Sequence, residues 1–595
     1  MKKSSALSNT RILSFLVIIF VYSLNGFSQA TIKNFQDHIK YLSSDQLMGR
    51  LTGSQGDSLA AVYIRTKLSS YGLKPLAGDG YQRFRVTKRI VPGKANNLAI
   101  NGLKLFPEKD FMPMIFSANA AKEAEVVFAG YGFNLKSDSL KWDDYEGVDV
   151  KGKWVMILRG DPEPDNPRSK FAPFSADRDK ALLAKDQGAA GILMVSGQGF
   201  DAQDAFESLG TDAFSVGIPA LRIKRTVADQ ILSHSQRSID SLEKQLNMSR
   251  KPASFSTGVS ATGEAELTRE TTNTRNVEMV LSGEDPKLRN EYIIIGAHFD
   301  HLGMGGPGSG SRALDTIGIH HGADDNASGV AMMLELAQKF AKTKGSHKRS
   351  IICLAFSGEE EGLLGSKHFT DDPGVDLSKV NVMINLDMVG RLNETKNLQI
   401  SGVGTAEGLK KIVYAKTDTS DVKLTLSDEG YGPSDHSSFY GKNIPVLFYF
   451  TGAHMDYHTP KDTWDKINYK GMVELSGLIF SVAQDLASED TRLKFREAGP
   501  KAQAVPYRRG KGVTLGIMPD FAGVVKNGLR ADFVTPGKPA ALGGMLKGDI
   551  ITHIDGKPVN NIEDYMFRLG QLKHGQTISV EVIRGEKNVV LLIQL

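Results

Sequence analysis

Short apolar runs alternate with longer amphipathic stretches across residues 265–490. Runs that are rich in β-branched residues and lack polar alternation predict strands that are buried on both faces of a sheet. The expected strands are Asn276–Leu281, Tyr292–Ala297, Ile351–Phe356, Val380–Leu386 and Val446–Tyr449. The expected helices are Ser328–Ala341, Leu363–Thr370, Glu407–Ala415 and Tyr469–Ala487. This alternation predicts an α/β fold: a doubly wound, mostly parallel sheet with helices on both faces.

The pattern changes on either side of this stretch. Residues 31–94 are expected to belong to the same domain and to be mainly helical as far as about Ile90. Residues 95–260 hold short strand-like pieces separated by loops, which predicts an inserted α/β domain. After a polar linker at 491–504, residues 505–595 predict a small, β-rich module with one short helix.

The first 30 residues have the pattern of a secretory signal. An apolar run, Ile12–Leu24, follows three cations, Lys2, Lys3 and Arg11, and a cut after Ala30 is expected. We therefore expect an exported protein, periplasmic or extracellular; the alternative is an uncleaved anchor, although the run is short for a membrane span. Removing these three cations from the formal charge of +4 leaves +1, so no nucleic-acid or membrane-surface partner is expected. No span is expected in the mature chain.

Candidate chemistry follows the predicted strands. The only cysteine, Cys353, lies within a predicted strand, where a thiol is normally a packing residue, so any metal must be held by His, Asp and Glu. Five places at strand ends or in the loops after them supply such groups: His298, Asp324, Glu359–Glu361, Asp387 and His458. Carboxylates crowded in one cleft raise one another's pKa values, and divalent cations remove that cost. A donor set without thiolate suits zinc, and five ligands suit two ions that share a carboxylate and activate water.

The phrases HFDHLG, GADDNASG, GEEEGLLGS, NLDMVGR and YHTPKDT, in this order, resemble the di-zinc aminopeptidase family, whose relatives include the glutamate carboxypeptidases and the transferrin receptor. The resemblance covers residues 31–90 and 265–490. It implies a cofactor of two Zn²⁺ ions. The ligands would be His298 and Asp387 for one ion, Glu360 and His458 for the other, and Asp324 as the bridge. It also places the unusual cis peptide of that family at Asp324–Asp325.

The resemblance assigns the glutamate triple as well. Matching GLLGS to the family's Gly-Leu-x-Gly-Ser implies that Glu359 is the general base, that Glu360 is the ligand, and that Glu361 lies outside the site. Asp300, two residues after His298, would accept a hydrogen bond from the imidazole.

Three further residues are expected beside the ligands. Asp325 and Asp435 are expected to support their neighbours without binding metal. The phrase GYGPSDHSSF resembles the family's pocket-side motif, which implies that Tyr431 could donate a hydrogen bond to the oxyanion; a packing tyrosine is the alternative.

These features predict a secreted metallo-aminopeptidase that hydrolyses the N-terminal bond of peptides with a zinc-bridging water and Glu359 as base. A carboxypeptidase or a glutaminyl cyclase on the same fold is an alternative. The sequence shows no arginine cluster for a substrate carboxylate, however, and cyclases of this type use one zinc. The third alternative is a catalytically inert, receptor-like homologue, which retention of every ligand and the base disfavours.

The two remaining domains carry their own resemblances. The order of strand-like pieces in 95–260 resembles the protease-associated domain, which implies a role in shaping access to the cleft. The last unit resembles a PDZ domain of the bacterial protease type, with Leu515, Gly516 and Ile517 in place of the carboxylate-binding loop. Such a loop would bind the C-terminal carboxylate of a peptide on backbone N–H groups, and a structural cap is the alternative.

Overall fold

The structure, a computed structural model, describes residues 32–498 and 513–595, apart from 138–139, 167, 208, 211–213, 307, 314, 418–420, 520–524, 526 and 536. The chain forms two compact units, residues 1–86 with 272–507 and residues 87–271 with 508–595. The predicted signal and the end of the predicted linker lie outside the described residues. Among the helices that are described, none is long and apolar enough to cross a bilayer.

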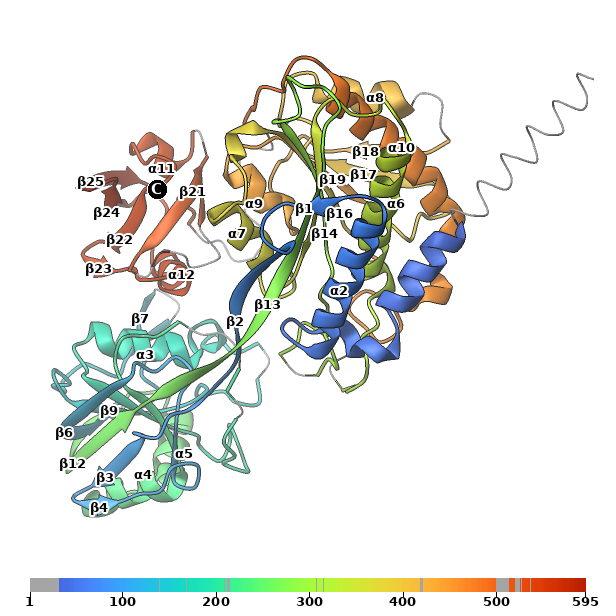
Figure 1. Ribbon diagram of the computed structural model, residues 1–595. Coiled ribbons are helices and arrows are strands. Elements are labelled where there is room, and N and C mark those ends of the chain that lie inside the picture. Colours follow the sequence, from blue (N-terminus) through green and yellow to red (C-terminus); the bar gives the residue numbers. More distant parts are fainter. Residues whose placement is uncertain are drawn as a thin grey trace, which may run out of the picture. The chain divides into compact units, whose positions relative to one another are not determined.

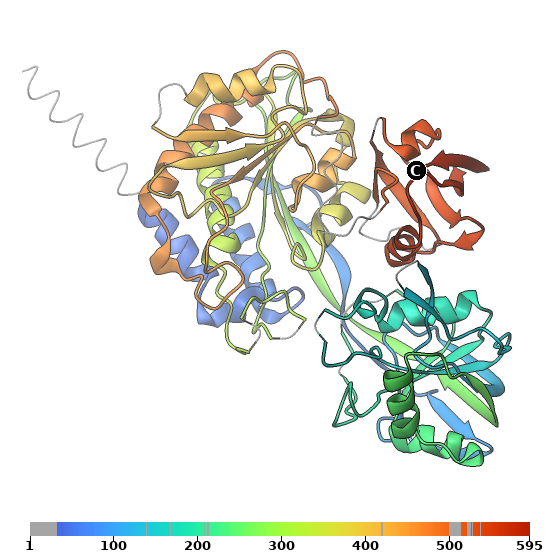
Figure 2. The same cartoon turned by 180° about the vertical axis from the view of Figure 1, so that it is seen from behind.

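A nine-stranded mixed sheet forms the centre of the first unit (Figure 1 and, from behind, Figure 2). Its central strands run in the order β15-β14-β16-β19 and are all parallel. Their bounds are Ser350–Phe356 for β15, Tyr292–His298 for β14, Val380–Leu386 for β16 and Val446–Phe450 for β19. Antiparallel strands β13 (Leu267–Leu281) and β17 (Asn397–Ser401) flank them. The predicted α/β fold is confirmed, with a doubly wound sheet whose central strands are parallel.

Helices cover both faces of this sheet (Figure 1). The helices α2 (Gln55–Ser70), α6 (Gly329–Lys342) and α10 (Tyr469–Ser488) lie on one face, and α7 (Leu364–Asp371) and α9 (His436–Gly441) lie on the other. Successive side chains of a strand point to opposite faces. Accordingly, Ile293 and Ile295 of β14 enter the first core, whereas Ile294 enters the second.

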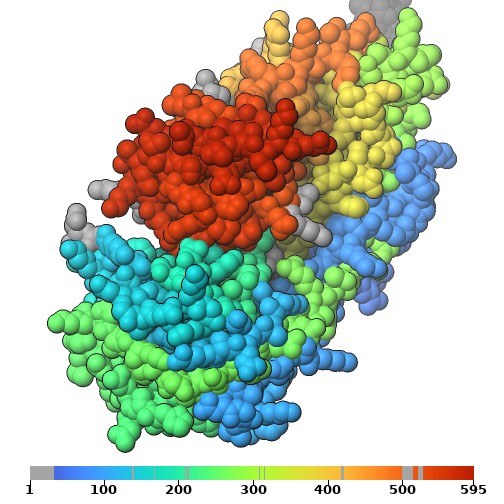
Figure 3. Space-filling model, turned by 90° about the vertical axis from the view of Figure 1, so that its left-hand side faces the viewer, coloured from blue at the N-terminus to red at the C-terminus, as the bar shows by residue number. Residues whose placement is uncertain are grey.

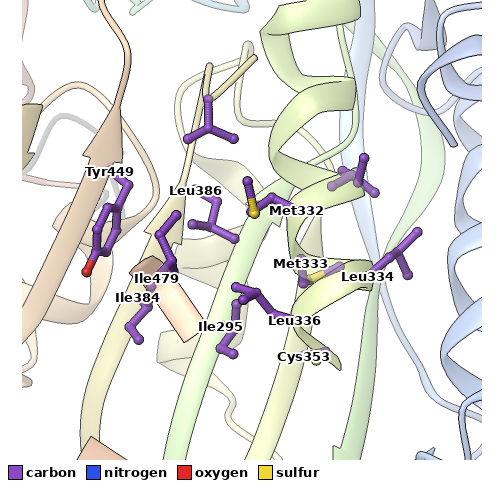
Figure 4. Packing of buried hydrophobic residues seen from close by; sticks show 14 of the residues in the cluster. Ile295, Met332, Met333, Leu334, Leu336, Cys353, Ile384, Leu386, Tyr449 and Ile479 are labelled. Carbon is purple, nitrogen blue, oxygen red and sulfur yellow. The ribbon is translucent and has the colours of Figure 1, made fainter. Parts of the chain in front are cut away.

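The larger core gives the site a rigid base. Figure 4 shows α6 side chains, among them Met332 and Leu336, beside the strand residues Ile295 and Ile384. Burial of each such side chain contributes about 1.5–3 kcal/mol. Cys353 belongs to the same core, where burial raises the pKa of its thiol to about 12.

One expectation for the N-terminal part is wrong. Residues 32–42 and α2 are helical as predicted, but residues 81–92 form the strand β2 (Tyr81–Pro92), which pairs with β13. Its buried apolar residues, Val86 and Ile90, are four positions apart. That spacing fits one face of a helix and one face of a strand equally well, so pairing with β13 decides between them.

The second unit contains two large sheets and a two-stranded one, β7 (Asn134–Ser137) with β8 (Leu140–Asp143). The first has eight strands, of which β9 (Trp154–Leu158), β10 (Gly191–Val195) and β11 (Ala220–Ile223) are parallel, and helix α3 (Asp177–Asp186) belongs to this domain. The second sheet is antiparallel and belongs to the C-terminal module. Its main strands are β20 (Ile517–Pro519), β21 (Leu529–Val534), β22 (Ile550–Ile554), β24 (Thr577–Arg584) and β25 (Lys587–Gln594). A single longer helix, α12 (Ile562–Gly570), accompanies this sheet among the described residues.

Helix α12 contacts the inserted domain within this unit. Figure 3 shows the C-terminal module, in red, next to that domain, in cyan and green. Arg568 forms a two-bond ion pair with Asp186 at the end of α3, and both side chains are buried. Arg178 of α3 pairs with Asp564 at 2.6 Å. Phe567 packs against the apolar cluster of the inserted domain. Buried charge and an aromatic anchor therefore hold the two domains together.

Replacing Arg568 by alanine should destabilise the second unit, because Asp186 would keep a buried charge with only Lys557, 3.6 Å away, to offset it. The expected loss is about 3–5 kcal/mol, measured as faster hydrogen exchange of α3 and α12 in the full chain. The double variant Arg568→Met with Asp186→Leu leaves no unpaired buried charge, so the protection of α3 and α12 against hydrogen exchange should largely return. Equal loss in both variants would contradict this account.

Candidate metal centre

Three of the predicted residues meet at the carboxyl ends of neighbouring strands. His298 ends β14, Asp387 follows β16, and Glu359 stands in the loop after β15. His298 Nε2 lies 3.5 Å from Asp387 Oδ1 and 4.0 Å from Glu359 Oε2. The histidine is buried, and the two carboxylates are about nine-tenths buried. Parallel neighbours that end together bring these groups to one place, as the crevice rule for open α/β sheets requires.

A second group forms beside the first. Glu360 comes from the same loop as Glu359, and His458 comes from the loop after β19. His458 Nε2 lies 3.2 Å from Glu360 Oε2 and 3.1 Å from Asp325 Oδ2.

Asp325, not Asp324, joins the two groups. Its Oδ1 lies 3.3 Å from His298 Nε2, while its Oδ2 faces His458. Asp324 points elsewhere: its Oδ1 accepts the Gly390 N–H at 2.7 Å and its Oδ2 lies 3.2 Å from His454 Nε2. The non-proline cis peptide is Asp325–Asn326, one bond beyond the expected Asp324–Asp325. Both sequence expectations for this turn are therefore corrected by one residue.

The turn that carries Asp325 is held by Asp462. The carboxylate oxygen Oδ2 of Asp462 accepts the N–H groups of Asp324 at 2.8 Å and Asp325 at 3.1 Å. Its other oxygen faces Arg391 Nη2 at 3.2 Å. Sequence reasoning missed Asp462, although it lies in the quoted phrase YHTPKDT.

Asp300 supports the glutamate loop more directly than it supports His298. Its oxygens accept the N–H groups of Glu359 at 3.1 Å and Glu360 at 3.3 Å, and the Thr52 hydroxyl at 2.9 Å. The carboxylate oxygen Oδ1 of Asp300 lies 3.7 Å from the His298 Nδ1 atom, which is too long for the expected hydrogen bond. The contact at 3.3 Å from that atom is to the Asp300 backbone carbonyl instead.

The remaining predicted residues lie around this cluster. Asp435 is fully buried, which raises the pKa of its carboxyl group to about 7. The Tyr431 ring packs edge-on against Tyr440, with ring centres 4.6 Å apart. Tyr457, which the sequence analysis overlooked, stacks on His458 with ring centres 3.9 Å apart. Its only sequence signal is its position next to a ligand.

The donor atoms have the spacing of metal ligands. Two donors bound to one tetrahedral zinc ion at about 2.0–2.1 Å lie roughly 3.3 Å apart. Four distances from a histidine Nε2 atom to a carboxylate oxygen lie between 3.1 and 3.5 Å. They are His298 to Asp325 and Asp387, and His458 to Asp325 and Glu360. The Asp387 Oδ1 atom is buried and makes no hydrogen bond with any described residue. The residues therefore fit two cations that share Asp325.

The pKa values of the two histidines also favour cations at this site. Burial by itself would lower the pKa of His298, but the carboxylates of Glu359 and Asp387 outweigh burial and hold this pKa well above its ordinary value. Hydrogen bonds to Asp325 and Glu360 likewise overcome burial and raise the pKa of His458 to about 10. Positive charge is thus favoured at two places, whether protons or metal ions carry it.

Three segments of the chain match known domain families. Residues 276–483 match peptidase family M28, residues 122–231 match the PA domain, and residues 512–595 match the PDZ domain. Aminopeptidase YwaD of Bacillus subtilis (strain 168) is 30% identical over 478 residues, which cover 78% of this chain and 86% of that protein. Leucine aminopeptidase 1 of Ajellomyces dermatitidis is 29% identical over 223 residues, 34% of this chain and 55% of that protein.

Solved structures are also similar. The aminopeptidase from Aneurinibacillus sp. strain AM-1 has a TM-score of 0.43 at 24% identity, covering 78% of this chain and 95% of that chain. A zinc aminopeptidase from Bacillus subtilis has a TM-score of 0.43 at 20% identity, covering 78% of this chain and 96% of that chain.

The match to a peptidase family over the doubly wound domain, whose strand ends carry the carboxylates and imidazoles, identifies this chain as a metallopeptidase. Its similarity to YwaD extends over most of both proteins. The chain belongs to peptidase family M28.

The variants Asp325→Asn and Asp324→Asn form a matched pair that tests the corrected bridge. Asp325→Asn removes the charge that faces both imidazoles, so the purified protein should lose at least one divalent metal ion. Asp324→Asn keeps an oxygen for the Gly390 N–H, so metal content should be retained. Elemental analysis of both variants measures this outcome, and the reverse result would restore Asp324 as the bridge.

Proposed function

We propose that this chain is an exported aminopeptidase that holds two zinc ions and removes N-terminal residues from peptides. The observation that carries the proposal is the placement of Asp325 between two groups of donors, each with the spacing of zinc ligands. The aminopeptidase name of a relative that is 30% identical over most of its length supports the amino end as the site of cleavage. Export rests on the basic and apolar pattern of residues 1–30.

One ion would be held by His298 and Asp387, the other by Glu360 and His458, and Asp325 would contact both. Zinc bound there supplies an acidified water and polarises a carbonyl oxygen. The surrounding residues hold these donors in position: Asp462 fixes the backbone of Asp325, and Asp300 fixes the backbone of Glu360.

Glu359 is the general base in this proposal. Its carboxylate lies 4.0 Å from His298 Nε2, at the edge of the first group and outside the 3.1–3.5 Å spacing of the ligands. Burial raises its pKa well above the ordinary value, and the charges of Glu360, Asp435 and Asp387 add to this effect. A carboxylate with a raised pKa takes a proton from water and then gives it to the leaving amine.

We assign the oxyanion donor to Tyr457 in preference to Tyr431. The Tyr457 ring stacks on His458, and the charges of Asp325 and Glu360 act on its hydroxyl group. Burial and those charges raise its pKa, so the hydroxyl keeps its proton and can donate it in a hydrogen bond to a developing oxyanion.

The C-terminal module is proposed to bind the free C-terminus of a peptide. Gly516 has a φ of 75°, and its N–H group donates a local hydrogen bond to the Thr514 hydroxyl oxygen at 3.1 Å. Leu515 is buried in the core of the module, and Ile517 begins β20. Gly516 lies between a buried residue and an edge strand, and exchange of its local hydrogen bond for one to a peptide carboxylate would let its N–H group take part in binding.

A substrate panel tests the proposed activity. Aminoacyl amides and peptides with a free α-amino group should be cleaved, N-acetylated peptides should not, and C-terminal amidation should have no effect. A chelator should abolish turnover and zinc should restore it, because the donors need a cation. Cleavage of N-acetylated peptides from their free C-terminus would establish a carboxypeptidase instead.

Glu359→Gln should keep both metal ions but lower kcat by about 10²- to 10⁴-fold, because the amide cannot accept the proton. Elemental analysis alongside steady-state kinetics checks both halves of this expectation. A rate near that of the unmodified enzyme would show that Glu359 is not the base.

Gly516→Val should weaken binding of a peptide with a free C-terminal carboxylate by at least about tenfold. A Cβ at Gly516 would lie 2.2 Å from Lys538 Cβ, and β-branched residues rarely adopt this left-handed conformation. Fluorescence anisotropy of a labelled peptide on the full chain provides the measurement, with the C-terminally amidated peptide as control. Hydrolysis of an aminoacyl amide should not change; undiminished peptide binding would count against this site.

A further inference from the structure

His301 is a fully buried histidine beside the metal centre that none of the roles above uses. It lies three residues after the end of β14, where its N–H donates to the Arg50 carbonyl at 3.1 Å and it forms a short bridge with Leu51. Its ring lies against Gly322, where an added Cβ would be 2.6 Å from the His301 Cδ2 atom. Backbone contacts on one side and a glycine on the other therefore fix the orientation of the ring.

The fixed ring points at one of the proposed ligands. His301 Nδ1 lies 2.7 Å from Glu360 Oε1 and 3.7 Å from Asp325 Oδ2. Two donors that share a tetrahedral zinc ion lie roughly 3.3 Å apart, so 2.7 Å is too short for a pair of ligands. It is the length of a charge-assisted hydrogen bond from N–H to a carboxylate. The other glutamate oxygen, Oε2, faces His458 at 3.2 Å, which is a ligand spacing.

The second ring nitrogen indicates which tautomer is present. His301 Nε2 is buried and has no hydrogen-bond partner among the described residues. An unpartnered buried N–H is costly, whereas a neutral ring that carries its hydrogen on Nδ1 leaves only a lone pair at Nε2. The Nδ1–H tautomer is also the one that can donate to Glu360.

We propose that His301 is a positioning residue for the second metal ion: it donates Nδ1–H to Glu360 Oε1 and thereby directs Oε2 toward the ion. The inference rests on the proposed two-zinc site and adds a third histidine to it. Without this hydrogen bond, the Glu360 carboxylate is free to rotate, and the ion loses part of its preorganised ligand set.

Three variants separate this role from general packing. Asparagine carries its amide nitrogen on Cγ, the same atom that bears Nδ1 in histidine, so His301→Asn keeps a donor near Glu360. In His301→Gln the amide lies one bond further out, nearer the Nε2 position, and in His301→Ala there is no donor. His320→Ala is the matched control. That residue is also buried, with a ring centre 6.5 Å from that of His301, but it bonds to Ser311 and Gly318.

The measurement is competition of each purified full-length variant with a zinc chelator, which gives the affinity of both ions, together with elemental analysis. We expect His301→Ala and His301→Gln to bind one ion about 10- to 100-fold more weakly and the other unchanged. His301→Asn should restore the weakened affinity to within about threefold, and His320→Ala should leave both affinities unchanged.

Each other outcome overturns the assignment in a distinct way. Unchanged affinities in all His301 variants would show that the hydrogen bond does not position Glu360. Equally weakened zinc binding in His301→Asn, His301→Gln and His301→Ala would indicate that His301 is a ligand or a packing residue. Zinc binding weakened as much in His320→Ala as in His301→Ala would show that the whole loop, and not the His301 hydrogen bond, affects the ion. If the unmodified protein binds no zinc, the proposed function itself fails, and that result is separate from these.

Discussion

The structure depends on one electrostatic constraint: several carboxylates are withdrawn from water and placed close together. Asp325, Glu359, Glu360 and Asp387 are all largely buried. Such a group is unfavourable alone, because burial and mutual repulsion both oppose ionisation. Imidazoles and divalent cations remove the cost, and His298 and His458 stand where they can provide or share that positive charge. The apolar core beneath the cluster keeps these groups from moving apart.

Two further carboxylates act on the backbone. Asp300 binds the N–H groups at the start of the glutamate loop, and Asp462 binds those of the turn that carries Asp325. The glutamate loop and the Asp325 turn are thus each held by a carboxylate that accepts two of their N–H groups. Arg50 serves the surrounding loops in a complementary way, because its buried guanidinium donates to four backbone carbonyls, including those of Phe299 and Gly322.

Much of the fold could be predicted because the buried parallel strands are short, largely apolar runs, most of them rich in β-branched residues, and β16 has the bounds predicted for it. The rule that ligands gather at the carboxyl ends of strands predicted that His298, the Glu359–Glu361 triple, Asp387 and His458 lie at one edge of the sheet, and the resemblance selected Glu360 from the triple. In the structure these groups lie close together. The choice between Asp324 and Asp325 could not be made from sequence. Two adjacent, identical residues point different ways, and the backbone of the turn alone decides which one faces the imidazoles.

Other details depended on contacts that are distant in sequence. Nothing in the sequence near Asp300 shows that its oxygens reach the backbone of Glu359, and the contacts of Tyr457 become visible only when its ring is seen on His458. The strand β2 was missed because the spacing of its buried residues fits two kinds of structure, and its partner, β13, lies far along the chain.

That pairing of β2 with β13 also bears on how such a chain can be rebuilt. Gln82 bonds to Asn276, and Arg89 to Glu270, so the outgoing and returning strands run side by side in opposite directions. The two ends of residues 87–271 are therefore neighbours, and a hairpin turn would suffice to join them. Inserted domains are best tolerated where their ends are close together. The junction is thus a natural grafting point, at which an accessory domain can be exchanged during evolution or by design while the order of the catalytic sheet is kept.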